Sequence, residues 1–330
     1  MVRRSTIKTA PAALFSVKES ILSGSKLIRV RVRDLHHGPI KLFDLGGPYK
    51  FFDAAVHRYK RTRSTTFGRG YARRSVPHVV FEPESLVTSA LVVIPARLNA
   101  TRLPRKPLAD ICGKPMIVRV LEQAQNADIG PVVVACDDES IAQAVRDHGG
   151  KAVMTRADHE SGSDRIQEAA DAIDPARNHD VVLNLQGDVP LIAPEAIRAA
   201  FAPLADASVD IGTIMTEIRE EQFRDDPSFV KAVVTPLGST AYRALYFTRA
   251  TAPTGDGPLF QHIGVYAYRR AALDRFVALP ASPLEVREKL EQLRALENGM
   301  RIDVSLIDTA PMDVNTPDDL ERARAAVSAQ

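Results

Sequence analysis

Cysteine is scarce in this sequence, which has only Cys112 and Cys136 among 330 residues. Disulfide bonds therefore do not form the framework of the fold, and a reducing cytoplasm is the expected location. Long apolar runs are missing too, because none reaches the roughly 18 to 20 residues that a membrane-spanning helix needs. With 45% hydrophobic residues, the chain can still bury a core. These features predict a soluble, globular enzyme that does not enter a membrane.

Acidic residues are few in the first quarter of the chain. Residues 1–86 carry 17 Lys and Arg against 6 Asp and Glu, a net charge of +11, whereas the remaining residues carry 26 against 35, a net charge of −9. The first segment also shows no sustained apolar period of helix or strand type. We therefore predict a basic, largely disordered N-terminal extension over residues 1–88 and a catalytic domain over residues 89–330.

The purpose of this extension is open. Its Arg- and Ser-rich composition resembles that of a transit peptide, and its basic runs could attract nucleic acid or anionic lipid. A translation start placed too far upstream would give the same composition.

Strands and helices alternate from about residue 90, which is typical of α/β proteins. Strands are expected at residues 91–95, 131–135, 152–154 and 181–185, with helices beginning after Gly113, Asp138, Ser161 and Ala193. Four further strands, at residues 210–216, 229–235, 242–247 and 263–268, have no long helices between them. A helix over 283–298, a strand over 301–307 and a helix over 317–327 complete the chain. The apolar strands imply a mainly parallel sheet with a mixed extension, whose ligands bind beyond the carboxyl ends of the strands.

Basic side chains gather in the loop after the first of these strands. Arg97, Arg102 and Lys106 lie within ten residues of one another. Such a loop, with its backbone N–H groups, can neutralise and orient a triphosphate. A solvated basic turn would have a similar composition, but the position directly after a buried strand favours a phosphate-binding loop.

A carboxylate follows another predicted strand. Gln186, Gly187 and Asp188 come directly after residues 181–185, so Asp188 is expected at the ligand-binding edge of the sheet. Magnesium prefers one or two carboxylates together with phosphate oxygens and water, which makes Asp188 the main candidate for a metal ligand. A turn residue that bonds its own backbone is the alternative.

Together these segments resemble the cytidylyltransferases that make CMP-3-deoxy-D-manno-octulosonate (CMP-Kdo). The resemblance covers residues 89–328 and rests on VIPAR (93–97), TRLP (101–104), SGSDR (161–165), NLQGD (184–188) and HIGVYAYR (262–269). It implies a three-layer α/β/α nucleotidyltransferase-like fold, a homodimer and Mg²⁺ as cofactor. It also implies that CMP passes from CTP to Kdo with release of pyrophosphate, for lipopolysaccharide-type glycans, and that no nucleic acid is required. Alternatives are another acidic sugar, such as 8-amino-Kdo or a sialic acid, or a nucleotide-binding homologue without catalysis.

The resemblance also implies roles for individual residues. The implied nucleotide site consists of Ala96, Arg97, Arg102, Lys106, Ser161, Gly162 and Gln186. The implied sugar site consists of Gln186, Arg249, His262, Glu291 and Gln292. Arg97, Arg102, Lys106 and Asp188 are the implied catalytic residues. Two alternatives stay open: His262 could be a structural residue of its strand, and Glu291 could belong to a solvated acidic helix face with Glu285 and Glu288.

Three positions depart from the family pattern. Asn315 stands where relatives usually have a second metal-binding Asp, and an amide oxygen brings no charge. Asp313 projects from the same face if this stretch is extended, so it could supply the missing carboxylate. Val189 replaces a usual Glu, and Arg105 replaces the usual Gly before the loop lysine. These departures bear on metal affinity more than on the fold.

Overall fold

The computed structural model describes residues 90–99, 102–159 and 161–329, and the backbone of five strands between residues 5 and 45. The chain divides into two compact units, Met1–Phe81 and Glu82–Gln330. In the first unit the strands form an antiparallel sheet, with bounds β1 (Ser5–Lys8), β2 (Ala13–Leu22), β3 (Ser25–Asp34), β4 (Gly38–Pro39) and β5 (Phe43–Leu45). The prediction of a largely disordered extension did not include these strands. The rest of the predicted extension lies outside the described residues.

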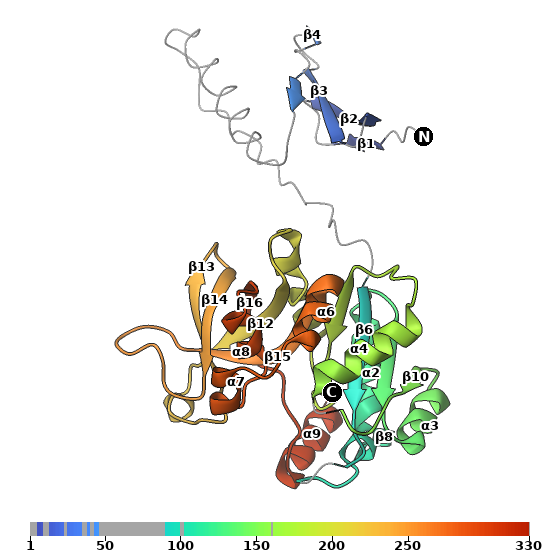
Figure 1. Cartoon of the computed structure of the whole chain (residues 1–330), viewed down its shortest axis with the longest axis vertical. Helices are drawn as coiled ribbons and strands as arrows, with labels where there is room; N and C mark the ends of the chain where they lie inside the picture. Colours follow the sequence, from blue (N-terminus) through green and yellow to red (C-terminus); the bar gives the residue numbers. More distant parts are fainter. Residues whose placement is uncertain are drawn as a thin grey trace. The chain divides into compact units, whose positions relative to one another are not determined.

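The second unit is built on a nine-stranded sheet with the order β10-β9-β6-β11-β15-β12-β16-β14-β13 (Figure 1). The strands are β6 (Ala90–Ala96), β9 (Val132–Cys136), β10 (Lys151–Met154), β11 (Val181–Asn184), β12 (Ile211–Glu217), β13 (Lys231–Pro236), β14 (Ala241–Thr248), β15 (Phe260–Arg269) and β16 (Ile302–Ile307). β10, β9, β6 and β11 pair in parallel, whereas β15 runs antiparallel to both β11 and β12. β12 and β16 are parallel, and β14 runs antiparallel to β16 and β13. The sheet is therefore parallel in one half and mixed in the other.

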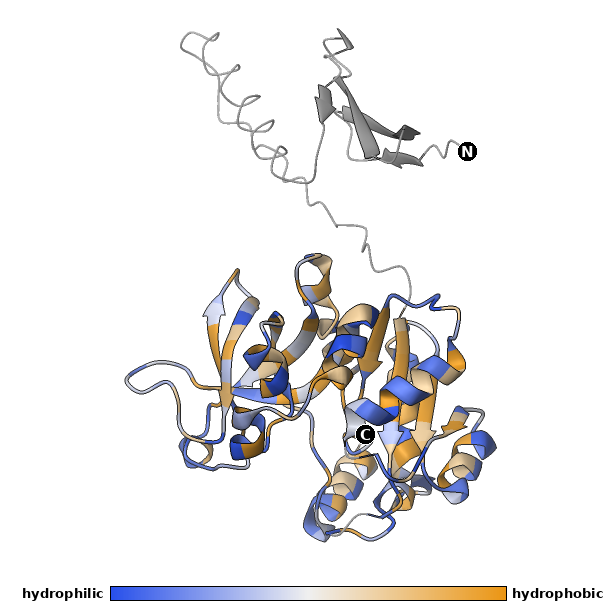
Figure 2. Cartoon of the chain, viewed as in Figure 1, coloured by the Kyte–Doolittle hydropathy of each residue, from blue (hydrophilic) through white to orange (hydrophobic). Residues whose placement is uncertain are grey.

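Helices cover both faces of this sheet. Successive strand residues point to opposite faces, and in β6 Val92 and Ile94 join one core cluster while Leu91 and Val93 join another. The first cluster includes residues of α2 (Met116–Asn126), α3 (Glu139–Asp147) and α5 (Pro194–Ala199), and the second includes residues of α4 (Gly162–Ile173), α6 (Arg270–Ala278) and α8 (Gln292–Glu297). Figure 2 shows the apolar residues concentrated on the strands between these helices. The predicted α/β class is confirmed, although α6 was not anticipated.

The predicted single helix over residues 283–298 is wrong. The structure has α7 (Pro283–Glu288) and α8, separated at Lys289, whose φ of 56° is left-handed and ends α7. The end of the second helix is as expected, since Gly299 follows it with a φ of 70°. β16 and α9 (Pro317–Ser328) also form where predicted. Among the helices that the structure describes, none has the length and apolar character of a membrane span.

Candidate active site

The loops after β6 and β11 meet because these strands are parallel neighbours in register. Leu185 N donates to the carbonyl oxygen of Val93 at 3.1 Å, which extends the pairing beyond β11. A Cβ atom at Gly187 would lie 2.9 Å from the Pro95 carbonyl oxygen, so only glycine lets this loop lie so close to β6. Asp188 comes next and is thereby carried to the edge of the sheet, as predicted.

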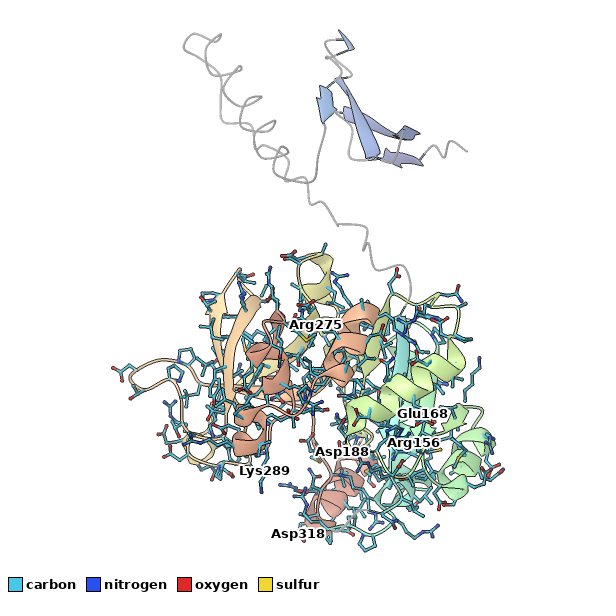
Figure 3. All side chains as sticks on the ribbon, viewed as in Figure 1. Arg156, Glu168, Asp188, Arg275, Lys289 and Asp318 are labelled. Carbon is cyan, nitrogen blue, oxygen red and sulfur yellow. The ribbon has the colours of Figure 1, made fainter. Side chains whose placement is uncertain are left out.

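Two side chains from distant segments, Asp188 and Asn315, contact the ammonium group of Lys106. Lys106 begins a short 3-10 helix, η1 (Lys106–Leu108), and its Nζ lies 2.8 Å from Asp188 Oδ2 and 2.9 Å from Asn315 Oδ1. The Lys106 side chain is 16% exposed and that of Asp188 27%, so the ion pair is only partly screened by water. In Figure 3 Asp188 lies above α9, the helix that follows Asn315.

The start of α9 determines where Asn315 points. Thr316 caps this helix, and the Asp319 carboxylate accepts from the backbone N–H groups of Asn315 at 2.9 Å and Thr316 at 2.8 Å. Just before the cap, Val314 N donates to the carbonyl oxygen of Asp188 at 2.9 Å. These backbone bonds hold the Asn315 side chain beside the loop that carries Asp188.

Asp313 belongs to the same group. Burial and the charge of Asp188 together raise its pKa to about 7, although the charge of Lys106 acts in the opposite direction. Part of the surface of Asp313 is open to solvent. These charge effects indicate that Asp313 lies near Asp188 and Lys106, and its role as a metal ligand stays a prediction.

The oxygen atoms of this group suit magnesium. Asp188 and Asn315 each place an oxygen within 3 Å of the same cation, Lys106 Nζ, and Asp313 adds a second carboxylate nearby. Within the described residues no three His, Cys, Asp or Glu side chains form a metal cluster, so the fit is to a site completed by phosphate and water. Two cations would repel each other strongly there, so the ammonium and a metal ion cannot share the point between these oxygens.

The other two cations of the phosphate loop are free to meet a ligand. Arg97 and Arg102 are exposed, and neither forms a hydrogen bond or ion pair with another described residue. Between them and Lys106, Arg105 has a φ of 54°, a left-handed conformation that glycine adopts without strain. Arg105 therefore holds a backbone conformation that costs a non-glycine residue free energy.

The start of α4 lies beside the end of β6. Ser161 accepts from Asp164 N at 3.1 Å, and Asp164 in turn accepts from Ser161 N at 3.1 Å, which confirms the predicted helix start. A Cβ atom at Gly162 would lie 3.8 Å from Pro95 Cγ, so this helix end is close to the phosphate loop. Free N–H groups at a helix start attract anions. Ala96 is buried at the end of β6, in the core cluster that includes residues of α2 and α3.

His262 is a buried residue of β15. Its Nε2 lies 3.0 Å from Thr213 Oγ1, and that hydroxyl donates to the Val265 carbonyl oxygen at 2.8 Å. The imidazole must therefore donate its Nε2–H, and burial lowers its pKa to about 3, which keeps it neutral. The ring packs edge-on against Phe247. His262 is thus a buried structural residue of its strand, which was one of the two predicted alternatives. Only its Nδ1 atom remains available for the predicted contact with the sugar.

Arg249 lies at the corner between α7 and α8. Its Nε donates to the Glu288 carbonyl oxygen at 2.9 Å, and its Nη1 donates to the Pro227 carbonyl oxygen at 3.0 Å. The Glu288 carboxylate accepts from Arg249 N at 3.0 Å and Thr248 Oγ1 at 2.9 Å. The Arg249 guanidinium therefore donates its hydrogen bonds to backbone carbonyl oxygens in this structure. Its binding to a sugar carboxylate stays a prediction.

Glu291 faces the start of α4. Ser163 Oγ donates to Glu291 Oε2 at 3.1 Å, whereas Oε1 is buried with no hydrogen-bond partner among the described residues. Desolvation raises the pKa of Glu291. Gln292 is buried beside it, and Gln186 Cγ lies 3.8 Å from the Cβ position of Gly264 in β15. The solvated acidic face is therefore the wrong interpretation for Glu291.

Sequence reasoning missed two residues near the phosphate loop. No role was predicted for Asp137, at the end of β9, or for Arg165 in α4, yet they form a buried ion pair beneath the phosphate loop. The signal was present, since Asp137 follows a parallel strand and therefore reaches the ligand-binding edge. Val189 is 3% exposed and belongs to the core, so no carboxylate from this position joins the site.

Comparison with known proteins decides the family. Residues 91–302 match the family model described as cytidylyltransferase. A 3-deoxy-manno-octulosonate cytidylyltransferase of Rhodopseudomonas palustris (strain TIE-1) is 62% identical over 236 residues, which are 72% of this chain and 96% of that protein. This chain belongs to the 3-deoxy-manno-octulosonate cytidylyltransferase family.

Two further comparisons agree with this membership. The 3-deoxy-manno-octulosonate cytidylyltransferase of Azorhizobium caulinodans is 62% identical over 241 residues, 73% of this chain and 96% of that protein. The structure of a CMP:2-keto-3-deoxy-manno-octonic acid synthetase complexed with CTP has a TM-score of 0.68 and 39% identity, and the match covers 73% of this chain and 99% of the other. These cytidylyltransferases are thus about as long as the second unit alone.

Proposed function

We propose that this chain transfers CMP from CTP to 3-deoxy-D-manno-octulosonate, giving CMP-Kdo and pyrophosphate for lipopolysaccharide-type glycan synthesis. The observation that carries the proposal is the convergence of Lys106, Asp188 and Asn315 at the ligand-binding edge of the sheet. Arg97 and Arg102 have no hydrogen-bond or ion-pair partner there among the residues that the structure describes. Cations and oxygen ligands for a further cation are what a triphosphate requires at one place. Family membership supports this reaction, because the relatives are named for it.

The chemistry is an in-line displacement at the α-phosphorus. The anomeric hydroxyl oxygen of the sugar acid forms the new bond to phosphorus, the bond to the bridging oxygen of pyrophosphate breaks, and the hydroxyl proton leaves to solvent. Such a reaction needs positioning and charge compensation more than a covalent intermediate. Arg97, Arg102 and Lys106 hold the phosphates, and the N–H groups at the start of α4 face the same anion.

Magnesium is the proposed cofactor. Asp188 and Asn315 would hold it, with Asp313 as a further carboxylate. When bound, it stabilises charge on the phosphate oxygens and lowers the pKa of the attacking hydroxyl. Lys106 Nζ leaves the two oxygens it contacts in this structure and binds phosphate instead.

The sugar acid lies on the other side of the proposed reaction centre. Gln186, Glu291 and Gln292 offer amide and carboxyl groups for its hydroxyls, and Arg249 is the proposed partner of its carboxylate. We further propose a cytoplasmic homodimer that forms through the mixed half of the sheet. Leu237 and Leu245, at the β13–β14 hairpin, are 53% and 56% exposed, and a partner would cover them. Analytical ultracentrifugation of the full chain tests the dimer, and a monomer at micromolar concentration refutes it.

A pyrophosphate-release screen tests the function. The full chain is incubated with magnesium, each of the four nucleoside triphosphates, and Kdo, 8-amino-Kdo, N-acetylneuraminate or no sugar. We expect release with CTP and Kdo only, and near-background release from the Asp188→Asn variant. Strong release with another acid would make the chain a cytidylyltransferase for that sugar. CTP binding without any release would make it a nucleotide-binding homologue.

A further inference from the structure

A buried ion pair lies directly beneath the phosphate loop. Arg165, in the first turn of α4, has a side chain that is fully buried, and its Nη2 lies 3.4 Å from Asp137 Oδ2. Its Nη1 donates to Thr155 Oγ1 at 2.6 Å, and that hydroxyl donates to the Cys136 carbonyl oxygen at 3.1 Å. The guanidinium thus ties α4 to the ends of β9 and β10, which both point towards the site.

The other oxygen of the same carboxylate holds the loop. Asp137 Oδ1 accepts from the backbone N–H of Leu98 at 3.0 Å, across 39 residues of sequence. Leu98 follows Arg97, so this bond fixes the peptide on which the first phosphate-binding cation is mounted. Arg97 in turn lies close enough to Arg165 for its charge to lower the pKa of Arg165.

Burying this ion pair costs free energy of folding, which indicates that the pair has a role other than stabilising the fold. Arg165 Nε is buried without a hydrogen-bond partner among the described residues, and a buried ion pair is weak evidence for stability because both charges lose their hydration. An apolar side chain of similar volume would fill the space without this cost. What the apolar side chain could not do is orient Asp137 towards the Leu98 N–H.

We propose that Asp137 is a positioning residue for CTP binding: Arg165 orients its carboxylate, and the carboxylate holds the Leu98 N–H so that Arg97 faces the phosphates. The inference rests on the proposed function, since it assumes that the loop binds a nucleoside triphosphate. Neither Asp137 nor Arg165 needs to touch the substrate. The sugar side, built from β15 and α8, shares no hydrogen bond with this pair among the described residues.

Two double variants, each without a charge at positions 137 and 165, test the hydrogen bond between the Leu98 N–H and the side chain at position 137. Asp137→Asn with Arg165→Met keeps an oxygen for the Leu98 N–H, whereas Asp137→Ala with Arg165→Met removes it. Neither buries an unpaired charge, so both are expected to fold. A hydrogen bond of ordinary net strength predicts that CTP binds about two- to tenfold more weakly to the Ala/Met variant than to the Asn/Met variant. The KM for Kdo should agree within about twofold between the two.

A neighbouring residue provides the matched control. Asp138 caps α3 by accepting from Ser140 N at 2.8 Å, and among the described residues its carboxylate forms no hydrogen bond or ion pair with the phosphate loop. The charge of Arg105 in that loop does lower the pKa of Asp138. Asp138→Ala should lower the melting temperature through loss of the cap without weakening CTP binding, because it removes a negative charge near the loop cation Arg105. Weaker CTP binding by this variant would mean that general destabilisation explains the effect, and would overturn the proposal.

The readout is the Kd for CTP from calorimetric titration of full-length proteins at one magnesium concentration, with the KM for Kdo measured in parallel. Equal Kd values for the Ala/Met and Asn/Met variants would overturn the positioning role. A wild-type chain that binds CTP but releases no pyrophosphate would refute the proposed function, and the binding comparison would still decide whether Asp137 positions the loop.

Discussion

The ammonium group of Lys106 contacts Asp188 and Asn315, so it links three distant segments of the chain. We predict that Lys106→Ala and Arg102→Ala each lower kcat/KM for CTP at least about tenfold, because hydrogen bonds to charged groups contribute roughly 1.5 to 3 kcal/mol. Initial rates of pyrophosphate release at varied CTP measure the effect. Lys114→Ala is the control, since Lys114 pairs with Glu122 on the surface and is 43% exposed. Near-normal rates for both loop variants would refute the phosphate-loop assignment.

The metal site can be dissected by single substitutions. Asn315→Asp should lower the magnesium concentration that gives half-maximal rate, because it restores a carboxylate, with the KM for sugar little changed. Asp188→Asn should nearly abolish turnover even at high magnesium, and Asp313→Asn should raise the magnesium requirement if Asp313 compensates for Asn315.

The measurement is a magnesium titration of the initial rate at saturating CTP and sugar. Asp318→Asn is a matched control, because Asp318 is an exposed residue in the first turn of α9, three positions after Asn315. Its titration should coincide with that of the wild type. A wild-type titration curve for Asp188→Asn would place the metal elsewhere.

His262 should make the fold sensitive to mild acid. In the unfolded chain its pKa is near 6.5, whereas burial lowers it to about 3 in the folded protein. Between these values the unfolded state binds the extra proton, so the free energy of unfolding falls as the pH falls. The expected loss from this residue is about 1.4 kcal/mol between pH 7.5 and 5.5. Urea denaturation of wild type and His262→Gln at both values measures it, and an equal loss in the two proteins contradicts the assignment.

The turn between α7 and α8 is where the prediction of a single helix over residues 283–298, made from sequence periodicity, was wrong. Arg294 in α8 forms a two-point ion pair with Glu285 in α7, with Nε–Oε2 at 2.8 Å and Nη2–Oε1 at 2.6 Å. Arg249 binds the carbonyl oxygen of Glu288 in the last turn of α7. These contacts hold the chain in the left-handed turn at Lys289, which local helix propensity opposes.

Glycine at this corner should stabilise the protein. Lys289→Gly relieves the cost of a left-handed non-glycine residue, so we expect the free energy of unfolding to rise by a few tenths to about 1 kcal/mol. Arg287→Gly, two residues earlier in α7, should instead lower it by about 0.5 to 1 kcal/mol. Urea denaturation at pH 7.5 compares them. A loss of stability in both would indicate that Lys289 contributes contacts beyond its backbone conformation.

For the whole chain, the two units should separate without loss of activity. The relatives cover 72% to 73% of this chain and 96% of their own length, and the family model begins at residue 91. We therefore predict that deleting residues 1–86 leaves the melting temperature of the second unit and the kinetics with CTP and Kdo unchanged. An insoluble or inactive truncated protein would show that the first segment is part of the catalytic domain.

The sequence by itself determined the features that depend on near neighbours. The strand and helix alternation from residue 90, the helix starts after Ser161 and at Pro317, and the glycine end of α8 were all predictable. Each depends on hydrogen bonds or apolar spacing within a few residues. Parallel strand pairing then brought Asp188 to the correct edge, because carboxyl ends of parallel strands share one side of the sheet.

Only the tertiary structure decided which of these groups meet. Lys106 and Asn315 are 209 residues apart, and the bond between them follows from the packing of α9 beside the loop after β11. The burial of Arg165, the neutral state of His262 and the break at Lys289 have the same origin. Burial, charge state and left-handed turns depend on what packs around a residue from distant parts of the chain, and local spacing carries no record of that.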